Sequence, residues 1–207
     1  MIKFLFFDFQ EIERVSGCER VFTTPQKHPA NPLMAPDAPW ETHKMTLYGS
    51  VIRRPDGGYQ LWYASRFTDG RLYLAYAESD DGLHWEKPTF RLGGDLPDGT
   101  NAVFAEPHGT AVLYDAADPR EEWRYKMVTG ARPSGCITAF RSPDGVRWTR
   151  VGPGPIIGTN PDCPIGFFRA RDGRYVMYHR VWGFGRRVLR SESWDFLHWS
   201  AEPRLVF

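Results

Sequence analysis

The segment Ser79-Asp80-Asp81-Gly82-Leu83-His84-Trp85 occurs again as Ser142-Pro143-Asp144-Gly145-Val146-Arg147-Trp148, and in a degraded form as Ser193-Trp194-Asp195-Phe196-Leu197-His198-Trp199. The three copies lie roughly 50 to 60 residues apart along the chain. Their Ser and Asp side chains can accept hydrogen bonds from the backbone of a tight turn, Gly supplies a positive φ, and Trp packs between sheets. The segment therefore predicts a structural hairpin that occurs three times, not a site of chemistry.

Short strand patterns rich in aromatic residues surround each copy, and a further short strand follows it. No stretch has a sustained 3.6-residue apolar period with caps, so little helix is expected. Each unit is interpreted as four antiparallel strands with the Asp-Gly turn between the last two. The strands predicted ahead of the three copies are 47–52, 57–63 and 72–77, then 111–114, 123–128 and 136–140, then 164–168, 173–178 and 187–189.

Four-stranded units at this repeat length are typical of β-propeller blades. The predicted fold is therefore all-β, a single propeller domain over residues 1–207 with about three blades, partial or open. Residues 1–44 form an N-terminal strand and lead-in, and the blades cover approximately 45–92, 100–155 and 160–207.

The composition excludes several classes of protein. Among 207 residues, 26 Lys and Arg stand against 25 Asp and Glu, a net charge of +1, which excludes a nucleic-acid binder with a broad basic face. The apolar run 4–7 is too short for a signal peptide or a membrane span. We therefore expect no membrane partner and a cytoplasmic location, or a secreted or periplasmic one if a leader was removed.

The sequence predicts neither a metal nor a cofactor. Three Cys without a CxxC pair make neither a disulfide framework nor a zinc site, and the six His do not fall at metal-ligand spacing. Phosphate-loop and dinucleotide-binding motifs are also missing from the sequence.

The repeated hairpins resemble the Asp-box hairpins of sialidases. From about Phe7 onward the chain resembles the five-bladed β-propeller glycoside hydrolases, the clan of families 32 and 43 and their bacterial relatives. The segments that carry this resemblance are 29–33, 39–41, 48–52, 61–63, 115–126 and 172–180.

The chain departs from that family in two respects. Three blades are present where five are expected, and the missing two would need roughly 100 more residues at this repeat length. Family members also carry an acidic residue at the start of the innermost strand of each of the first three blades. In the first blade this position falls near Tyr48 or Gly49, and neither residue is acidic.

The resemblance implies a carboxyl pair at the propeller axis, because glycoside hydrolysis uses one carboxyl as acid and the other as nucleophile or base. Asp162 is the first candidate, since it lies just before the third predicted inner strand; as a structural residue it would cap a turn. Glu41 and Glu106 are the candidates for the second carboxyl, and each could equally be an exposed loop residue.

Other residues are candidates for substrate binding. Asn101 and His108 precede the second inner strand, and Arg66 and Arg180 end corresponding strands of the first and third blades. An Arg guanidinium near an aromatic ring such as Trp182 suits a sugar carboxylate or vicinal hydroxyls, although an ion pair between blades is an equal alternative.

These observations predict a glycoside hydrolase acting on a plant or microbial oligo- or polysaccharide. Whether it is an enzyme at all stays open, since a non-catalytic glycan-binding propeller would keep the same funnel without a competent carboxyl pair. A third alternative is a scaffold or fragment whose open blade edges pair with another chain or with a second copy of itself.

Overall fold

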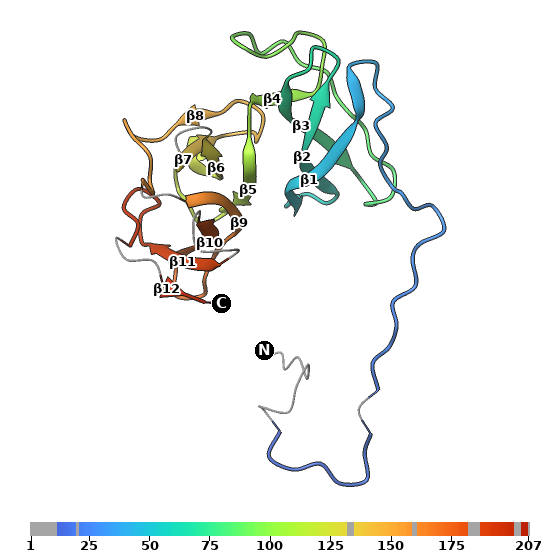
Figure 1. The fold of residues 1–207 in the computed structure, drawn as a ribbon, viewed down its shortest axis with the longest axis vertical. Helices are drawn as coiled ribbons and strands as arrows, with labels where there is room; N and C mark the ends of the chain where they lie inside the picture. The colour runs from blue at the N-terminus through green and yellow to red at the C-terminus, as the bar shows by residue number, and fades with distance from the viewer. Residues whose placement is uncertain are drawn as a thin grey trace. The chain divides into compact units, whose positions relative to one another are not determined.

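A computed structural model describes residues 12–19, 21–131, 135–158, 161–181, 187–200 and 204–206. The chain divides into two compact units, Met1–Asn31 and Pro32–Phe207. In the first unit the described residues contain no strand or helix, and a short turn joins the Asn31 N–H to the His28 carbonyl at 3.0 Å. All the strands that the structure describes belong to the second unit (Figure 1).

The second unit consists of three four-stranded antiparallel sheets, each built from strands that follow one another in the sequence. The first sheet comprises β1 (Glu41–Arg53), β2 (Tyr59–Phe67), β3 (Leu72–Ser79) and β4 (Ala102–Ala105). The second comprises β5 (His108–Tyr114), β6 (Tyr125–Ala131), β7 (Cys136–Ser142) and β8 (Thr149–Arg150). The third comprises β9 (Pro161–Arg169), β10 (Tyr175–Val181), β11 (Val188–Ser193) and β12 (Arg204–Leu205).

The predicted all-β fold with three four-stranded units is confirmed. A single 3₁₀ turn at η1 (Glu121–Trp123) is the only helical element in the part of the chain that is described. The first sheet extends beyond the predicted first blade, residues 45–92, because its edge strand β4 begins at Ala102. After the first hairpin the chain makes two isolated bridges, Glu78 with Glu86 and Phe90 with Thr100, before it returns as β4.

The three repeated segments are hairpins held by the same local hydrogen bonds. In the first copy, Ser79 Oγ accepts the Gly82 N–H at 2.8 Å, and Asp81 Oδ1 accepts the N–H groups of Leu83 at 2.7 Å and His84 at 2.8 Å. The second and third copies repeat this pattern around Asp144 and Asp195. The Ser and Asp of the motif are therefore used by the backbone of the turn.

The middle hairpin differs from the other two in the hydrogen bond of its tryptophan. Trp85 Nε1 donates to the Gly82 carbonyl at 3.2 Å, and Trp199 Nε1 donates to the Phe196 carbonyl at 3.1 Å. In the middle copy the Gly145 carbonyl instead accepts Trp62 Nε1 from the first sheet at 2.7 Å. Trp148 Nε1 is buried and has no acceptor within the described segments.

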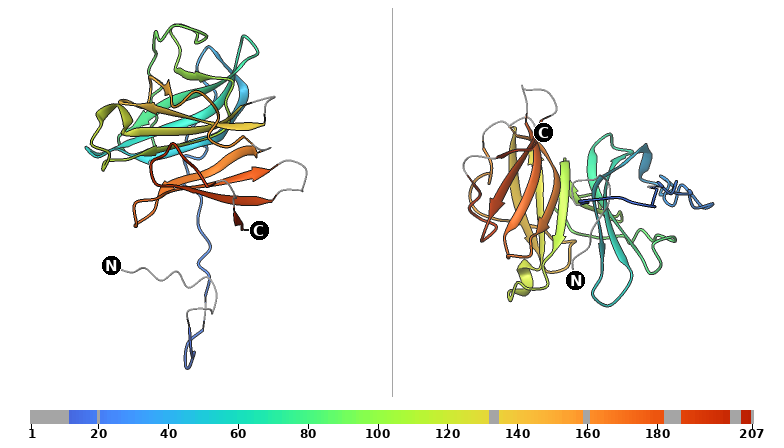
Figure 2. Two further views of the ribbon diagram at one scale, coloured as in Figure 1. Left: turned by 90° about the vertical axis from the view of Figure 1, so that its left-hand side faces the viewer. Right: turned by 90° about the horizontal axis from the view of Figure 1, so that it is seen from below.

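Apolar side chains pack neighbouring sheets against each other, and Figure 2 shows how the sheets fan out. The core between the first and second sheets includes Trp62, Leu74, Tyr76, Val103, Val112, Tyr125, Met127 and Val146. The core between the second and third sheets includes Ala111, Val128, Ile137, Ala139, Ile157, Phe167, Tyr175, Met177 and Phe196.

The first strand of each sheet lies on the inner side of this arrangement, with β5 packed between β1 and β9. The Val112 N–H of β5 donates to Ser50 Oγ of β1 at 2.8 Å. On the other side Gly109 has a φ of +57°, and a Cβ built there would lie 2.6 Å from Cys163 Cβ of β9. Val112 and Ser50 both lie near the ends of their strands, whereas Gly109 and Cys163 both lie near the beginnings of theirs. The three inner strands β1, β5 and β9 therefore run in the same direction and begin at the same end of the unit.

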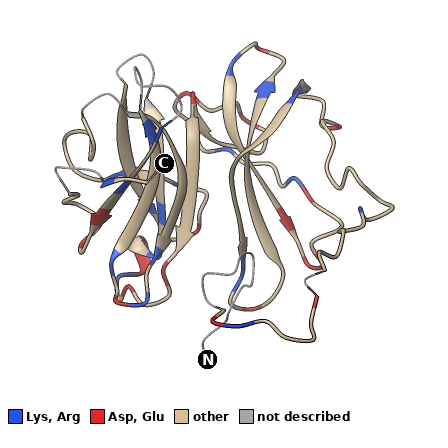
Figure 3. Cartoon of the chain, turned by 60° about the horizontal axis from the view of Figure 1, so that its bottom comes forward, with Lys and Arg blue, Asp and Glu red and all other residues tan. Residues whose placement is uncertain are grey.

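Charged residues are found mainly in loops and at strand ends, with both signs intermixed (Figure 3). None of the described segments forms a helix long and apolar enough to cross a membrane.

The hairpin tryptophans provide a test of this packing, because all three rings are half-buried. We expect Trp85→Phe to lower the free energy of unfolding by about 1 kcal/mol more than Trp148→Phe does, since only Trp85 loses a hydrogen bond. Urea unfolding of the two variants measures the difference. An equal loss in both variants would contradict the assigned bonding.

Candidate functional site

The polar residues that begin the inner strands form the candidate site. The chain turns from β4 into β5 at Glu106 and Pro107, and His108 is the first residue of β5. Pro161 and Asp162 are the first two residues of β9, whose start packs beside that of β5. The sequence-predicted residues Glu106, His108 and Asp162 are thus brought to one end of neighbouring inner strands by the backbone.

Glu106 combines an unusual backbone conformation with an exposed side chain. Its φ is +53°, a conformation that residues other than glycine adopt at a cost and that is often found at active sites. Its N–H donates to the Leu72 carbonyl at 2.9 Å, which ties the corner to the start of β3. Its side chain is 61% exposed, and Arg71 Nε donates to Oε1 at 3.4 Å.

Neutral hydrogen-bonding groups line the same end of the second and third sheets. Thr110 and Thr129 have their hydroxyl oxygens 3.1 Å apart, and the N–H of the half-buried His108 donates to Thr129 Oγ1 at 3.4 Å. On β10, His179 is buried, with Nε2 3.0 Å from Ser191 Oγ. Burial lowers the pKa of His179, so this imidazole is neutral at pH 7.

Glu41 does not lie in this site, contrary to the expectation that its loop would reach the funnel. Its side chain is fully buried. Oε2 accepts Lys87 Nζ at 2.6 Å, and Oε1 accepts the Tyr63 hydroxyl at 2.8 Å. Burial and the negative charge of Glu41 together raise the pKa of Tyr63. The carboxylate therefore fastens residues 35–41 to the first sheet and is not accessible to a substrate.

Asn101 is likewise buried instead of facing a sugar. Its Oδ1 accepts Trp40 Nε1 at 2.8 Å, while Nδ2 donates to the Tyr63 hydroxyl at 2.8 Å and to the Tyr76 carbonyl at 2.7 Å. Both ends of the amide are used inside the protein, so Asn101 holds the buried network together with Glu41.

The remaining candidates end strands at the site end of their sheets. Arg66, near the end of β2, donates to the Gly70 carbonyl of its own hairpin. Arg180 lies near the end of β10, opposite Val188 of β11. The side chain of Asp162 and the whole of Trp182 lie outside the described residues, so their predicted roles stay predictions.

Sequence reasoning missed Arg71 and His179 as members of this site. Arg71 is 35 residues from Glu106, and the β3–β4 pairing of Tyr73 with Ala105 brings the two together. His179 adjoins the predicted Arg180, but no pattern in the sequence indicates that its imidazole is buried.

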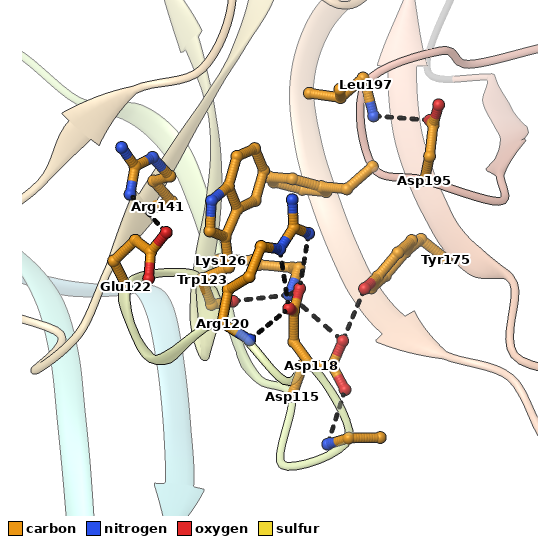
Figure 4. Close-up of polar contacts among 12 residues, drawn as sticks. Asp115, Asp118, Arg120, Glu122, Trp123, Lys126, Arg141, Tyr175, Asp195 and Leu197 are labelled. Atoms are coloured by element: carbon orange, nitrogen blue, oxygen red, sulfur yellow. Dashed lines mark hydrogen bonds and ion pairs between the residues drawn. The ribbon is translucent and has the colours of Figure 1, made fainter.

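A second, buried polar cluster joins the opposite ends of the second and third sheets (Figure 4). The Lys126 ammonium is fully buried and donates to Asp115 Oδ2 at 3.2 Å, Asp118 Oδ2 at 2.9 Å and the Trp123 carbonyl at 2.6 Å. Asp115 also accepts Arg169 Nη1 at 2.5 Å and the Tyr175 hydroxyl at 2.6 Å, both from the third sheet. All of these charges are paired, so the cluster is a structural link between sheets.

The segments that are described contain no group of three His, Cys, Asp or Glu side chains arranged to hold a metal ion.

Comparison with known proteins defines the fold more closely than the activity. No protein-family profile matches the chain. A protein of unknown function from Mycobacterium tuberculosis strain H37Rv is 30% identical over 155 residues, which cover 66% of this chain and 48% of that protein. Its counterpart from another strain of the same species matches equally. The chain therefore spans about half the length of the curated relatives it matches.

Several solved structures with a similar arrangement of strands are carbohydrate-active proteins. A fructofuranosidase from Schwanniomyces occidentalis, complexed with fructosylnystose, superposes with a TM-score of 0.60 at 13% identity, over 82% of this chain and 35% of that one. A thermostable family-43 glycoside hydrolase gives 0.54 at 18% identity, over 76% and 51%. A structure from GH130, a family of mannoside phosphorylases containing glycoside hydrolases that target β-1,2-mannosidic linkages in Candida mannan, gives 0.56 at 19%, over 87% and 59%.

The chain shares the strand arrangement of part of these proteins. At these identities the likeness shows the fold, and the fold alone does not give a substrate or a reaction.

The buried cluster makes folding dependent on pH. Burial alone would raise the pKa values of Asp115 and Asp118, but hydrogen bonds and the charge of Lys126 outweigh it and lower both. A carboxyl group whose pKa is lower in the folded than in the unfolded state stabilises the fold at pH values above its unfolded-state pKa of about 3.9. This contribution is lost as the pH falls through the folded-state pKa. We expect the free energy of unfolding to decrease from about pH 5 downward.

Asp118→Asn should flatten this decrease, whereas Asp98→Asn, at an exposed loop position, should leave it unchanged. Denaturation at a series of pH values measures the slope. A slope in Asp118→Asn equal to that of the original chain would contradict the role of the cluster.

Proposed function

We propose that this chain acts on glycosidic bonds at the end of the propeller where β5 and β9 begin, with Glu106 and Asp162 as the carboxyl pair. The observation that supports the proposal is the position of Glu106. It is an exposed carboxylate on a strained backbone corner at the start of an inner strand, in a fold shared with glycoside hydrolases.

The surroundings of Glu106 suggest its role. We assign Glu106 as the nucleophile or base, because the Arg71 guanidinium donates to Oε1 at 3.4 Å and so fixes the position of the carboxylate. Asp162 would then supply the proton to the leaving oxygen. His108, Arg66 and Arg180 are proposed to contact sugar hydroxyls, because they lie at the same end of their sheets.

A non-catalytic glycan-binding propeller is the second candidate, and one observation favours it. Glu41 is the only acidic residue of β1, and its carboxylate is buried against Lys87 and Tyr63. The first inner strand therefore offers no accessible carboxylate, which leaves at most the second and third strands to provide a catalytic pair.

Assembly with further chain belongs to the same proposal. Leu47, Tyr48 and Val51 of β1 and Ile165 and Phe168 of β9 are exposed large apolar side chains at the two ends of the row of sheets. Such surfaces suit pairing with additional sheets, from a longer chain or from a second copy.

Activity measurements with Glu106→Gln and Asp162→Asn test the proposal. Release of reducing sugar from fructosylnystose and from a β-1,2-mannan should fall by roughly 10²- to 10⁴-fold in either variant, with the thermal midpoint retained. Glu121→Gln, an exposed glutamate in η1 at the opposite end of the second sheet, should keep the original rate.

Two results would change the conclusion. Unchanged turnover in Glu106→Gln would exclude that residue as a catalytic group. Saturable binding of either sugar by the original chain, without any turnover, would establish the glycan-binding alternative.

A further inference from the structure

A cavity of about 450 Å³ lies at the outer side of the first and second sheets, away from the inner strands. Its walls are the loop 92–96, strand β4 and residues 146–148 of the middle hairpin. Both sheets that form it belong to this chain, so the cavity is complete without any additional blade. Its size falls within the range of small-molecule sites.

The lining combines an apolar surface with a few polar groups. Phe104 and Trp148 provide aromatic surface, and Phe104 is fixed by an edge-to-face contact with Phe140 at a centroid distance of 4.8 Å. Asp95 and Arg147 are both exposed and provide a carboxylate and a guanidinium at the rim. A sugar ring carries C–H groups on its flat faces and hydroxyls at its edge. An apolar floor with one acceptor and one donor beside it therefore matches such a ring.

The indole of Trp148 lacks a hydrogen bond that its two counterparts make. The Gly145 carbonyl, the expected acceptor, is taken by Trp62 Nε1, and Trp148 Nε1 is buried with no acceptor among the described residues. The Trp148 ring is therefore not tied to its own turn, and the exposed part of this half-buried ring is what a ligand in the cavity can contact. In the first and third hairpins, by contrast, the Trp85 and Trp199 rings are bonded to their own turns.

Arg147 is a second residue that distinguishes the middle hairpin from the other two. Its Nη1 donates to Asp144 Oδ2 at 2.9 Å, which holds the guanidinium over the hairpin while the side chain stays 70% exposed. The corresponding residues of the first and third copies are His84 and His198, which pair with their Asp in the same way. A guanidinium keeps further N–H donors for a ligand after making this contact, whereas a single imidazole has at most one.

We propose that this cavity binds one neutral hexose unit of a glycan, with its ring against Trp148 and its hydroxyls bonded to Arg147 and Asp95. The opposite charges of the two polar residues favour a neutral ligand over an acidic or phosphorylated one. The site is separate from the carboxyl pair proposed at the inner strands, and it stands whether or not that pair is catalytic.

Nuclear magnetic resonance of the ¹⁵N-labelled chain tests the site, since the eight Trp residues give eight indole N–H signals. The Trp148 signal is identified by its loss in Trp148→Phe. We expect titration with D-mannose, D-galactose or D-fructose to shift this signal saturably for at least one of the three sugars.

Arg147→His is the decisive variant, because His stands at this position in the other two hairpins and the turn should fold normally. We expect this variant to weaken sugar binding about tenfold, measured as the dissociation constant, because one good hydrogen bond is lost. Arg150→His, at an exposed position of β8 outside the cavity, should not weaken it. Glu106→Gln should leave it unchanged, which separates this site from the proposed catalytic one.

Two outcomes would overturn the proposal. One is a Trp148 signal that none of the three sugars shifts up to their solubility limits. The other is an equal response in the original chain and in Arg147→His.

Discussion

The position of the candidate site depends on how closely β5 approaches β9. Gly109 makes this approach possible, because any side chain there would meet Cys163 Cβ at 2.6 Å and the Pro164 carbonyl oxygen at 3.0 Å. Its φ of +57° also favours glycine. The start of β5, with Glu106 and His108, is thereby set beside the start of β9, where Asp162 lies. A carboxyl pair from two different sheets is only feasible because the two backbones are in contact here.

The same reasoning explains why the first sheet contributes no acidic residue. The sequence resemblance places the acidic position near Tyr48 or Gly49, and a Cβ on Gly49 would lie 1.9 Å from the Trp62 carbonyl oxygen. The irregular pairing between Thr46 and Ser50 brings the backbone of β1 onto β2 at this point, leaving no room for a side chain at Gly49. The first inner strand is thus shaped for packing, and Glu41 is used to hold the segment that precedes it.

Much of the fold could be predicted from the sequence because its signals are local. The hairpin hydrogen bonds of Ser79 and Asp81 span two or three residues, and strand periodicity is equally short in range. Burial of Glu41 and Asn101 could not be predicted, since their partners Lys87 and Trp40 are 46 and 61 residues away. The hydrogen bonds of a turn are determined by neighbouring residues, whereas the environment of a carboxylate depends on which strands pair.

We propose that Glu106 and Asp162 form the carboxyl pair of a sugar-binding space at this end of the inner strands. A crystal structure of the chain with a bound oligosaccharide measures the separation of these two carboxyl groups directly. The account predicts a separation of about 5 to 9.5 Å with the glycosidic oxygen between them, the shorter end indicating retention and the longer end inversion of stereochemistry. A separation well beyond that range, or an Asp162 carboxylate turned into the protein, would contradict it.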